Sequence, residues 1–182
     1  YSDFLKKRLQ NAIKLDEDSL STFDIEYGSF IADKVNEFVK EKRIDIIDFI
    51  ASHGHTIFHE PDKGLTKQIG CGQTIANKTN KKVVCDFRTQ DVLFGGQGAP
   101  LVPVGDQLLF YDYDACVNLG GFANISYEKN NERIAYDICA VNTVLNNFSQ
   151  QLGFEYDDKG ILSAKGNLNQ LILTELNQLN FY

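Results

Sequence analysis

Asp137 is the carboxylate whose position best suits acid–base chemistry. It stands at the end of a predicted strand over residues 134–138, and Asn142 follows at the start of a predicted helix. A carboxylate at this place could take a proton from a hydroxyl group or a water molecule. It could instead cap the helix or be an ordinary exposed aspartate at a strand end. Residue type and spacing leave both interpretations open.

Two adjacent glycines, Gly120 and Gly121, separate predicted strands over residues 116–119 and 122–127. Paired glycines tolerate positive φ and let backbone N–H groups converge on the oxygens of a phosphate. Gly-Gly is also a favoured two-residue turn of a β-hairpin. The pattern therefore predicts either a phosphate-binding turn or a plain hairpin connection.

Asp86 and Arg88 flank Phe87 at the end of a predicted strand over residues 82–87. Residues two apart on a strand share a face, so the carboxylate and the guanidinium could form a structural ion pair. Arg88 could equally hold an anionic or hydroxylated ligand, because its planar set of donors matches such groups. The sequence favours neither the structural ion pair nor the ligand-binding role of Arg88.

Three histidines, His53, His55 and His59, suggest a zinc site that Asp86 could complete. Their spacing is not that of a strong zinc motif, so turn and hydrogen-bonding roles are favoured and no metal ligand is assigned. The four cysteines form no CxxC pair, which favours free thiols in a reducing compartment over a disulfide framework.

The hydrophobic pattern predicts both helices and strands to position these residues. Helices are expected over residues 3–14, 23–42, 72–80, 142–152 and 168–179, and strands over 44–51, 56–59, 66–69, 82–87, 116–119, 122–127 and 134–138. The run over 44–51 is almost wholly apolar, as in buried parallel strands, and it ends just before His53, where α/β sheets bind ligands. The glycines and prolines of residues 95–103 predict a domain junction close behind them, near residues 105–114.

Composition narrows the class of protein. The chain has 182 residues, of which 43% are hydrophobic, and a net charge of −7. This apolar content excludes a disordered chain, and the acidic balance argues against a nucleic-acid partner. No run reaches the roughly 18 apolar residues of a membrane span, so no membrane partner is expected. The absence of Met indicates a processed or truncated product.

Six segments carry a family resemblance: SHGHTIFHEP, QIGCGQTIA, VVCDFRTQD, GGQGAPLVP, NLGGFANIS and YDICAVN, in this order. Together they resemble the anhydro-N-acetylmuramic acid kinase family over nearly the whole chain. The resemblance implies an α/β, ribonuclease-H-like fold of the actin-like ATPase class, with mixed sheets flanked by helices and two lobes around a cleft. Residues 1–110 would be the remainder of the N-terminal lobe, without its first strands and phosphate loop, and residues 111–182 the start of the C-terminal lobe.

The resemblance also implies an activity. Members of the family use ATP, Mg²⁺ and water to open 1,6-anhydro-N-acetylmuramic acid hydrolytically and phosphorylate it to N-acetylmuramic acid 6-phosphate. This is a cytoplasmic step of cell-wall recycling. The expected partners are therefore the anhydro-sugar and ATP, while homodimerisation stays open.

Site residues are carried over by position in the matching motifs. Asp137 falls on the proposed general base, which takes a proton from the water that attacks the anomeric carbon. The phosphate side of the nucleotide site would be formed by Gly120, Gly121 and Asn124. The sugar side would be formed by His53, Asp86 and Arg88.

Three departures from the family pattern affect what the resemblance implies. The glycine-rich phosphate loop of the first lobe has no counterpart here, so the chain alone is expected to have little or no kinase activity. The family motif DTGPGN reads DICAVN at residues 137–142, so both glycines and the proline are replaced, and Val141 cannot adopt a glycine conformation cheaply. His55 replaces a family glutamine. The alternative function is a non-catalytic relative that binds sugar or nucleotide.

Overall fold

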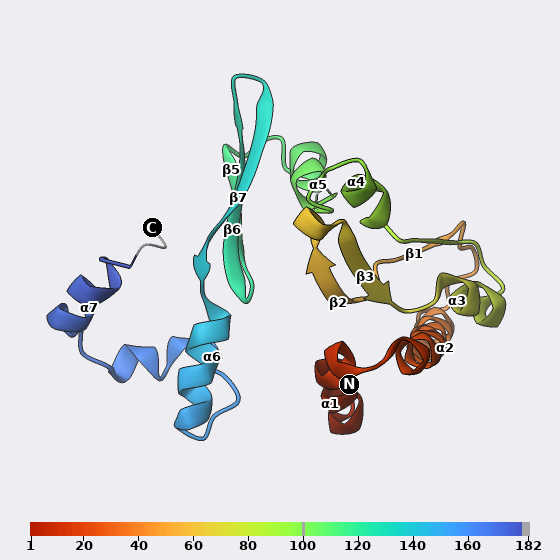
Figure 1. The fold of residues 1–182 in the computed structure, drawn as a ribbon, viewed down its shortest axis with the longest axis horizontal. Coiled ribbons are helices and arrows are strands. Elements are labelled where there is room, and N and C mark those ends of the chain that lie inside the picture. The colour runs from red at the N-terminus through yellow and green to blue at the C-terminus, as the bar shows by residue number, and fades with distance from the viewer. Residues whose placement is uncertain (100, 180–182) are drawn as a thin grey trace. The chain divides into compact units, whose positions relative to one another are not determined.

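The computed structural model describes residues 1–99 and 101–179, which form two compact units (Figure 1). Unit 1 covers the described residues up to 99, and unit 2 covers those from 101. Each unit contains helices and strands, so the predicted α/β class is confirmed. Among the described residues, no helix has the length and apolar character needed to cross a membrane.

Within residues 1–99, unit 1 is built from one long helix, three shorter helices and two small sheets. Its helices are α1 (Asp3–Asn11), α2 (Glu17–Lys42), α3 (Gly72–Thr79) and α4 (Thr89–Leu93), with short 3-10 helices η1 (Ala12–Lys14) and η2 (Pro61–Lys63). Its strands are β1 (Ile50–Ser52), β2 (His55–Glu60), β3 (Leu65–Ile69) and β4 (Val83–Cys85).

Helix α2 organises the core of unit 1. It begins after Asp16, whose carboxylate accepts a hydrogen bond of 2.8 Å from the Ser19 N–H, and this bond lowers the pKa of the carboxyl group. The helix packs on α3 and β3. Its inward face repeats at steps of three and four residues, as an amphipathic helix requires, and includes Leu20, Phe23, Tyr27 and Ala32.

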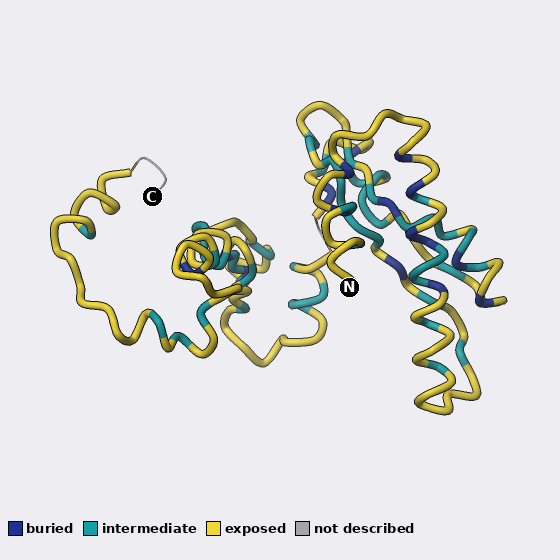
Figure 2. Tube along the Cα trace, turned by 90° about the horizontal axis from the view of Figure 1, so that it is seen from below, coloured by how far each residue is buried: buried dark blue, intermediate teal, exposed yellow. Residues whose placement is uncertain are grey.

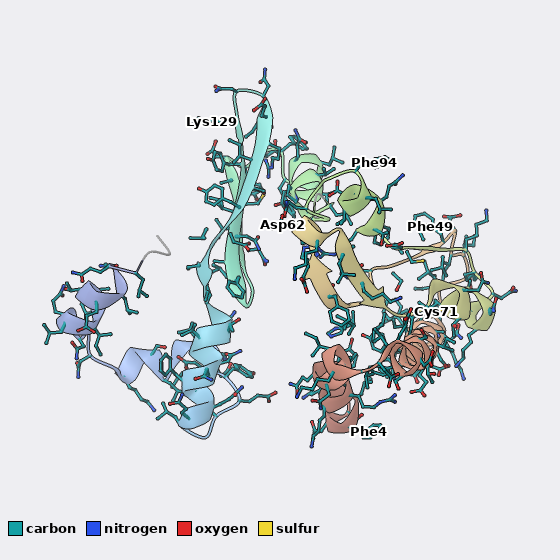
Figure 3. All side chains as sticks on the ribbon, in the orientation of Figure 1. Phe4, Phe49, Asp62, Cys71, Phe94 and Lys129 are labelled. Atoms are coloured by element: carbon teal, nitrogen blue, oxygen red, sulfur yellow. The ribbon has the colours of Figure 1, made fainter. Side chains whose placement is uncertain are left out.

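The strand predicted over residues 44–51 is wrong for its first part. Only Ile50–Ser52 is a strand, and Ile46 and Phe49 are exposed, with Phe49 on an outer segment in Figure 3. The register pairs β1 with β4 in parallel over three residues. A strand needs a neighbouring strand for its backbone groups, and among the described residues the pairing with β4 begins only at Ile50. The buried strand predicted over 82–87 shortens to β4, in which Val84 and Cys85 are exposed.

The predicted strand pair around residues 61–64 is confirmed. Strands β2 and β3 are antiparallel, and η2 joins them before Gly64, which has φ +69°. Helix α3 confirms the prediction over 72–80, and α1 with η1 occupies the helix predicted over 3–14. Helix α4 was not predicted.

Unit 2 is a three-stranded antiparallel sheet with helices before and after it. It contains α5 (Leu101–Leu109), β5 (Ala115–Leu119), β6 (Phe122–Lys129), β7 (Glu132–Ala140), α6 (Asn142–Gln151), η3 (Asp158–Gly160), η4 (Ser163–Lys165) and α7 (Gln170–Leu176). The strand order is β5-β6-β7, so the predicted meander is confirmed. The last helix is shorter than the predicted 168–179. The helix predicted over 142–152 is confirmed as α6.

Tight turns set the register of this sheet. Asn130 and Asn131 connect β6 to β7 with φ values of 55° and 64°, the left-handed pair that a type I′ hairpin turn requires. At the other end of β6, the ladder shifts between Ala123 and Asn124. Ala123 pairs with Cys139 and Asn124 pairs with Asp137, so Ile138 is the extra residue of a β-bulge.

The two units differ in their cores. Unit 1 buries large side chains, including Phe23 at 1% exposure, Ile69 and Ile75, whereas Ala123 is the buried hydrophobic residue of unit 2 among the described residues. The buried segments of Figure 2 accordingly concentrate in α2, α3 and the strands of unit 1. One face of the unit 2 sheet carries exposed Val117, Leu119 and Tyr136.

The division between the units lies before α5. The lobe boundary predicted from the sequence, at residue 110, falls just after this helix, and α5 packs on β6 and β7 of unit 2. The assignment of the two units to two lobes stays a prediction.

Candidate functional site

Two of the three residues predicted for the sugar side line one cavity of unit 1. The cavity measures about 210 Å³. His53 and Gly54 enter it from the turn after β1, and Asp86 enters from the turn after β4. Because β1 and β4 are parallel neighbours, their carboxyl ends bring these residues to one edge, as in open α/β sheets. The wall is completed by Asp24, Ser52, Gln68, Ile69, Gly70, Cys71, Gly72 and Cys85.

Arg88 is joined to this group through His53. Its Nε–H donates a hydrogen bond of 2.8 Å to His53 Nε2. Since a guanidinium only donates, Nε2 of His53 carries the lone pair and its Nδ1 carries the proton. That Nδ1–H donates to the Gly54 carbonyl oxygen at 3.2 Å. The arginine therefore fixes the orientation and tautomer of His53 at the rim of the cavity, and does not pair with Asp86.

Asp86 has a left-handed backbone, with φ +57°. Asparagine and aspartate are the non-glycine residues that tolerate this conformation best. Its Oδ1 accepts a hydrogen bond of 3.3 Å from the Thr89 N–H at the start of α4. Strained backbone of this kind concentrates at functional sites, and here it turns the chain from β4 into α4.

The glycine loop after α4 is tied to the same arginine. Arg88 Nη1 donates to the Gly98 carbonyl oxygen at 3.0 Å, and the Gly98 N–H donates to Asp91 Oδ2 at 2.6 Å. A Cβ atom on Gly96 would lie 2.2 Å from that carboxylate oxygen. The loop is thus held by Arg88 and Asp91, and a side chain at Gly96 would disturb the contact with Asp91.

Asp24 of α2 positions the part of the cavity wall that lies between β3 and α3. Its Oδ1 accepts from the Gly70 N–H at 2.6 Å, and its backbone oxygen accepts from the Cys71 N–H at 3.1 Å. Cys71 accordingly lies against α2 in Figure 3. These bonds fix the chain between β3 and α3.

The three histidines do not assemble into a metal site. His59 bonds Thr66 Oγ1 through Nδ1 at 3.3 Å, while His55 packs edge-on to Tyr27. Burial lowers the pKa of His55, and the nearby His53 lowers it further. Within residues 1–99 and 101–179, no group of three or more His, Cys, Asp or Glu side chains is placed to hold a metal ion.

Unit 2 brings Asp137 and Asn124 together. They are direct partners across β6 and β7, and Asn118 is the partner of Asn124 across β5 and β6. Direct antiparallel partners have Cβ atoms about 4.5–5.5 Å apart and share a face. Asn118, Asn124 and Asp137 therefore form one polar row across the sheet. Asp137 lies inside β7, which continues to Ala140, so it is neither the strand end nor the cap of α6.

The Gly120–Gly121 turn is connected to the start of α6. The Gly121 carbonyl oxygen accepts from the N–H groups of Val141 and Thr143 at 2.8 and 3.2 Å. Asn142 Nδ2 donates to the Gly120 carbonyl oxygen at 2.8 Å. The turn thus satisfies N–H groups that a helix start leaves without partners.

The positive φ expected at Gly120 and Gly121 is not found, and the Gly120 N–H donates to the Phe122 carbonyl oxygen at 3.2 Å. The predicted nest of converging N–H groups is therefore wrong for this backbone. A Cβ atom on Gly121 would lie 2.8 Å from Thr143 Oγ1, so the Thr143 side chain would have to move to make room for it.

Sequence reasoning missed Asn118 as a candidate site residue. The signal was the strand register, which puts it beside Asn124 and in line with Asp137. Alternation alone groups residues within one strand, but only the pairing of different strands shows that these three share a row.

Comparison with known proteins gives the family. A family model described as anhydro-N-acetylmuramic acid kinase matches residues 1–182. The anhydro-N-acetylmuramic acid kinase of Shewanella denitrificans is 37% identical over 180 residues, which cover 93% of this chain and 49% of that protein. The protein of the same name from Haemophilus influenzae is 34% identical over 184 residues, which cover 94% of this chain and 48% of that protein.

A third relative, from Azorhizobium caulinodans, carries the same name and is 41% identical over 137 residues, which cover 71% of this chain and 37% of the relative. The chain spans about half the length of the curated relatives from Shewanella and Haemophilus. The match over its whole length nevertheless decides the family: this chain belongs to the anhydro-N-acetylmuramic acid kinases.

Proposed function

We propose that this chain carries the sugar side and the phosphate side of an ATP-dependent kinase that opens and phosphorylates 1,6-anhydro-N-acetylmuramic acid. The observation that carries the proposal is the register that sets Asp137 directly opposite Asn124, on the sheet whose first turn is Gly120–Gly121. The proposed fold is the actin-like ATPase fold, with unit 1 in the N-terminal lobe and unit 2 in the C-terminal lobe. The cysteines are free, which suits the cytoplasm as its compartment.

The sugar is proposed to bind at the cavity of unit 1. Sugars offer hydroxyl groups, and the cavity edge offers both acceptors and donors for them. Asp86 accepts hydrogen bonds, while Arg88 and His53 are held together at 2.8 Å. The 210 Å³ cavity is smaller than the about 300–1,000 Å³ of typical ligand sites, so it accommodates part of the sugar.

Asp137 is proposed to be the general base. It takes a proton from a water molecule as that water attacks the anomeric carbon of the anhydro-sugar. The bond from that carbon to the bridging oxygen breaks, and the released oxygen takes the γ-phosphoryl group of ATP. The exposed position of Asp137 within β7 leaves its carboxylate accessible to a water molecule.

The phosphate side is proposed to use Asn124 and the close backbone approach that Gly120 and Gly121 permit. Asn118 and Asn124 offer amide groups beside the carboxylate of Asp137. Bound with ATP, Mg²⁺ would neutralise phosphate charge, while the residues of the row would orient the reacting groups.

The proposal is tested with a chimeric protein that has the full length of the relatives. The segment of the Shewanella denitrificans kinase that matches this chain is replaced by the chain itself, and ADP release is measured with and without the anhydro-sugar. We expect release only with the sugar, and Asp137→Asn should lower the rate by about 10²–10⁴-fold. Asp112→Asn changes an exposed aspartate of the same unit and serves as the control.

An unchanged rate in the Asp137→Asn chimera would assign the base to another residue. A chimera that is stabilised by sugar or nucleotide but releases no ADP would favour the alternative function, a binding module without catalysis. The 182-residue chain by itself is expected to show little or no turnover.

A further inference from the structure

The turn that carries His53 rests on the chain between β3 and α3. Gly54, which follows His53, approaches this chain so closely that a Cβ atom on it would lie 2.3 Å from the Ile69 carbonyl oxygen. A Cβ atom on Gly70 would in turn lie 3.3 Å from the Gly54 Cα atom. Both contacts are with backbone atoms, which cannot rotate away as the end of a side chain can. The position of residues 69 and 70 therefore sets the position of Gly54.

Gly54 in turn holds the imidazole of His53. Its carbonyl oxygen accepts a hydrogen bond of 3.2 Å from the Nδ1–H of His53, while His53 Nε2 accepts one of 2.8 Å from Arg88. Gly54 has φ +72°, a conformation that glycine adopts at little cost. A displacement of Gly54 would move its carbonyl oxygen away from Nδ1. It would thus break one of the two bonds that orient the ring.

Asp24 of α2 fixes the chain on which Gly54 rests. Its Oδ1 accepts a hydrogen bond of 2.6 Å from the Gly70 N–H, and its backbone oxygen accepts one of 3.1 Å from the Cys71 N–H. The other carboxylate oxygen, Oδ2, lies 4.0 Å from Lys67 Nζ, a distance at which a partly exposed ion pair contributes little. The hydrogen bond to Gly70 is therefore the main contact of this side chain.

One turn further along α2, Gly28 brings the helix against the same chain. A Cβ atom on Gly28 would lie 2.8 Å from the Cys71 carbonyl oxygen and 2.9 Å from its nitrogen, and Cys71 lies beside α2 in Figure 3. Residues four apart lie on one face of a helix, so Asp24 and Gly28 belong to a single surface of α2. The close approach at Gly28 keeps the carboxylate of Asp24 within hydrogen-bond distance of Gly70.

We propose that Asp24 is a positioning residue of the sugar side, which orients His53 through the chain at Gly70. The contacts from Asp24 to His53 all lie within unit 1. The inference rests on the proposed function in one respect, the role given there to His53 at the sugar. Asp24 acts by accepting the Gly70 N–H, so its effect depends on a correctly placed acceptor oxygen and not on its charge.

The first test observes the imidazole directly and needs no sugar. The 182-residue chain is labelled with ¹⁵N-histidine, and the ring nitrogens are followed by NMR at about pH 8, where histidine is neutral. His53→Gln identifies the signals of His53 among the three histidines. In the parent chain Nδ1 of His53 should carry the proton. In Asp24→Ala this signature should be lost, because the released ring exchanges between its two tautomers.

Two further variants of Asp24 separate the acceptor oxygen from the charge. Asp24→Asn keeps an acceptor oxygen at the same place and should keep the Nδ1-protonated form of His53. Asp24→Glu keeps the charge but displaces the carboxylate by one methylene, so it should lose that form as Asp24→Ala does. The test therefore does not depend on the folding of a single variant.

Asp33→Ala is the matched control. Asp33 also joins α2 to α3, through an ion pair of 2.7 Å with Lys78. Among the described residues, the wall of the cavity includes Asp24 but not Asp33. Asp33→Ala should therefore leave the ring signals of His53 as they are in the parent chain.

The second test measures sugar kinetics in the full-length chimera. Asp24→Ala should raise KM for the anhydro-sugar about tenfold, the effect of losing one well-placed hydrogen bond. It should change kcat less than about threefold, because a contact made equally in the ground state and the transition state affects binding alone. Asp24→Asn and Asp33→Ala should keep KM within about twofold of the parent value.

The outcomes separate the positioning role from the proposed function. A lower Tm of Asp24→Ala with the parent tautomer of His53 and an unchanged KM would mark a purely structural role and overturn the inference. An Asp24→Asn variant that loses the tautomer as fully as Asp24→Ala would also overturn it. A parent chimera without sugar-dependent turnover contradicts the proposed function, whereas the NMR result still decides whether Asp24 orients His53.

Discussion

At the scale of single residues, hydrogen-bond direction defines the sugar side more sharply than residue type does. The sequence left Arg88 either as a partner of Asp86 or as a ligand-binding group. In the structure Arg88 donates to His53 and to Gly98, while Asp86 accepts from Thr89. These partners follow from the turns after β1 and β4, which no spacing rule specifies.

His55 should make unit 1 less stable in mild acid. Its pKa is lowered from 6.5, first by burial. The unfolded chain therefore binds more protons than the folded chain, so the stability present above about pH 6.5 is lost as the pH falls through the folded pKa. Thermal unfolding at pH 7 and pH 5 should show a lower Tm at pH 5.

His55→Gln, which introduces the amide expected at this position from the family resemblance, should reduce that difference. The lowered carboxyl pKa values of Asp16 and Asp157 start from 3.8, so their effect on stability belongs to a more acidic range. An identical pH dependence in parent and variant would contradict the role of His55.

A side chain at Gly121 should displace the Thr143 side chain, whereas a side chain at Gly120 should displace nothing. A Cβ atom on Gly121 meets Thr143 Oγ1 at 2.8 Å, whereas on Gly120 the nearest atoms lie at 3.5 Å or beyond. Gly121→Ala should thus speed hydrogen exchange at the first amides of α6, and Gly120→Ala should not. Thr143→Ala added to Gly121→Ala should restore protection. Equal exchange in the two single variants would contradict this steric account.

At the scale of elements, the sequence predicted what depends on local pattern. The helices over 17–42 and 142–151 and the three-strand meander are present because their apolar spacing and turn residues act within a few residues. The strand over 44–49 is absent because a strand depends on a neighbour that local pattern does not reveal. Helix α5 was missed because Pro103 and Gly105, which follow the glycine-rich run of residues 95–98, indicated a loop.

The candidate site was predictable in its residues but not in its geometry. Motif positions gave Asp137, Asn124 and His53, whereas the polar row with Asn118 depends on a bulge at Ile138 that sets the register. Ile138 lies between Asp137 and Cys139, and nothing in the alternation of β7 marks it as the extra residue. The nest predicted at Gly120 and Gly121 was wrong because neither glycine has a positive φ and the Gly120 N–H donates to the Phe122 carbonyl oxygen.

Helix α2 should supply most of the stability of unit 1. Phe23→Ala removes a side chain that is 1% exposed and should cost about 3–5 kcal/mol of the free energy of unfolding. Phe38→Ala on the same helix changes a residue that is 53% exposed and should cost far less. Urea unfolding followed by the circular dichroism of the helices measures both, and equal costs would contradict the packing described for α2.

At the scale of the whole molecule, the uneven distribution of the core predicts two different stabilities. Unit 1 buries Phe23, Ile69 and Ile75, while unit 2 buries Ala123 and leaves Val117 and Tyr136 exposed on one sheet face. Apolar patches of this kind mark surfaces that associate. The chain should therefore self-associate through unit 2 as its concentration rises.

Sedimentation velocity over a range of concentrations tests this expectation. Val117→Asp places a charge on the apolar face and should shift the distribution towards monomer. Asn118→Asp places the same charge on the adjacent residue, whose side chain belongs to the opposite face, and should leave association unchanged. A parent chain that stays monomeric at every concentration would contradict the role of this face.

The hairpin tip at Asn130 and Asn131 has a practical consequence. Strand β6 runs from Phe122 to Lys129, so about 25 Å of extended chain separates this tip from the Gly120–Gly121 turn. Both asparagines are exposed, and exposed loop tips accept insertions best. A short epitope or a fluorescent amino acid introduced there would allow the protein to be captured or followed during turnover without interfering with the chemistry at the far end of the strand.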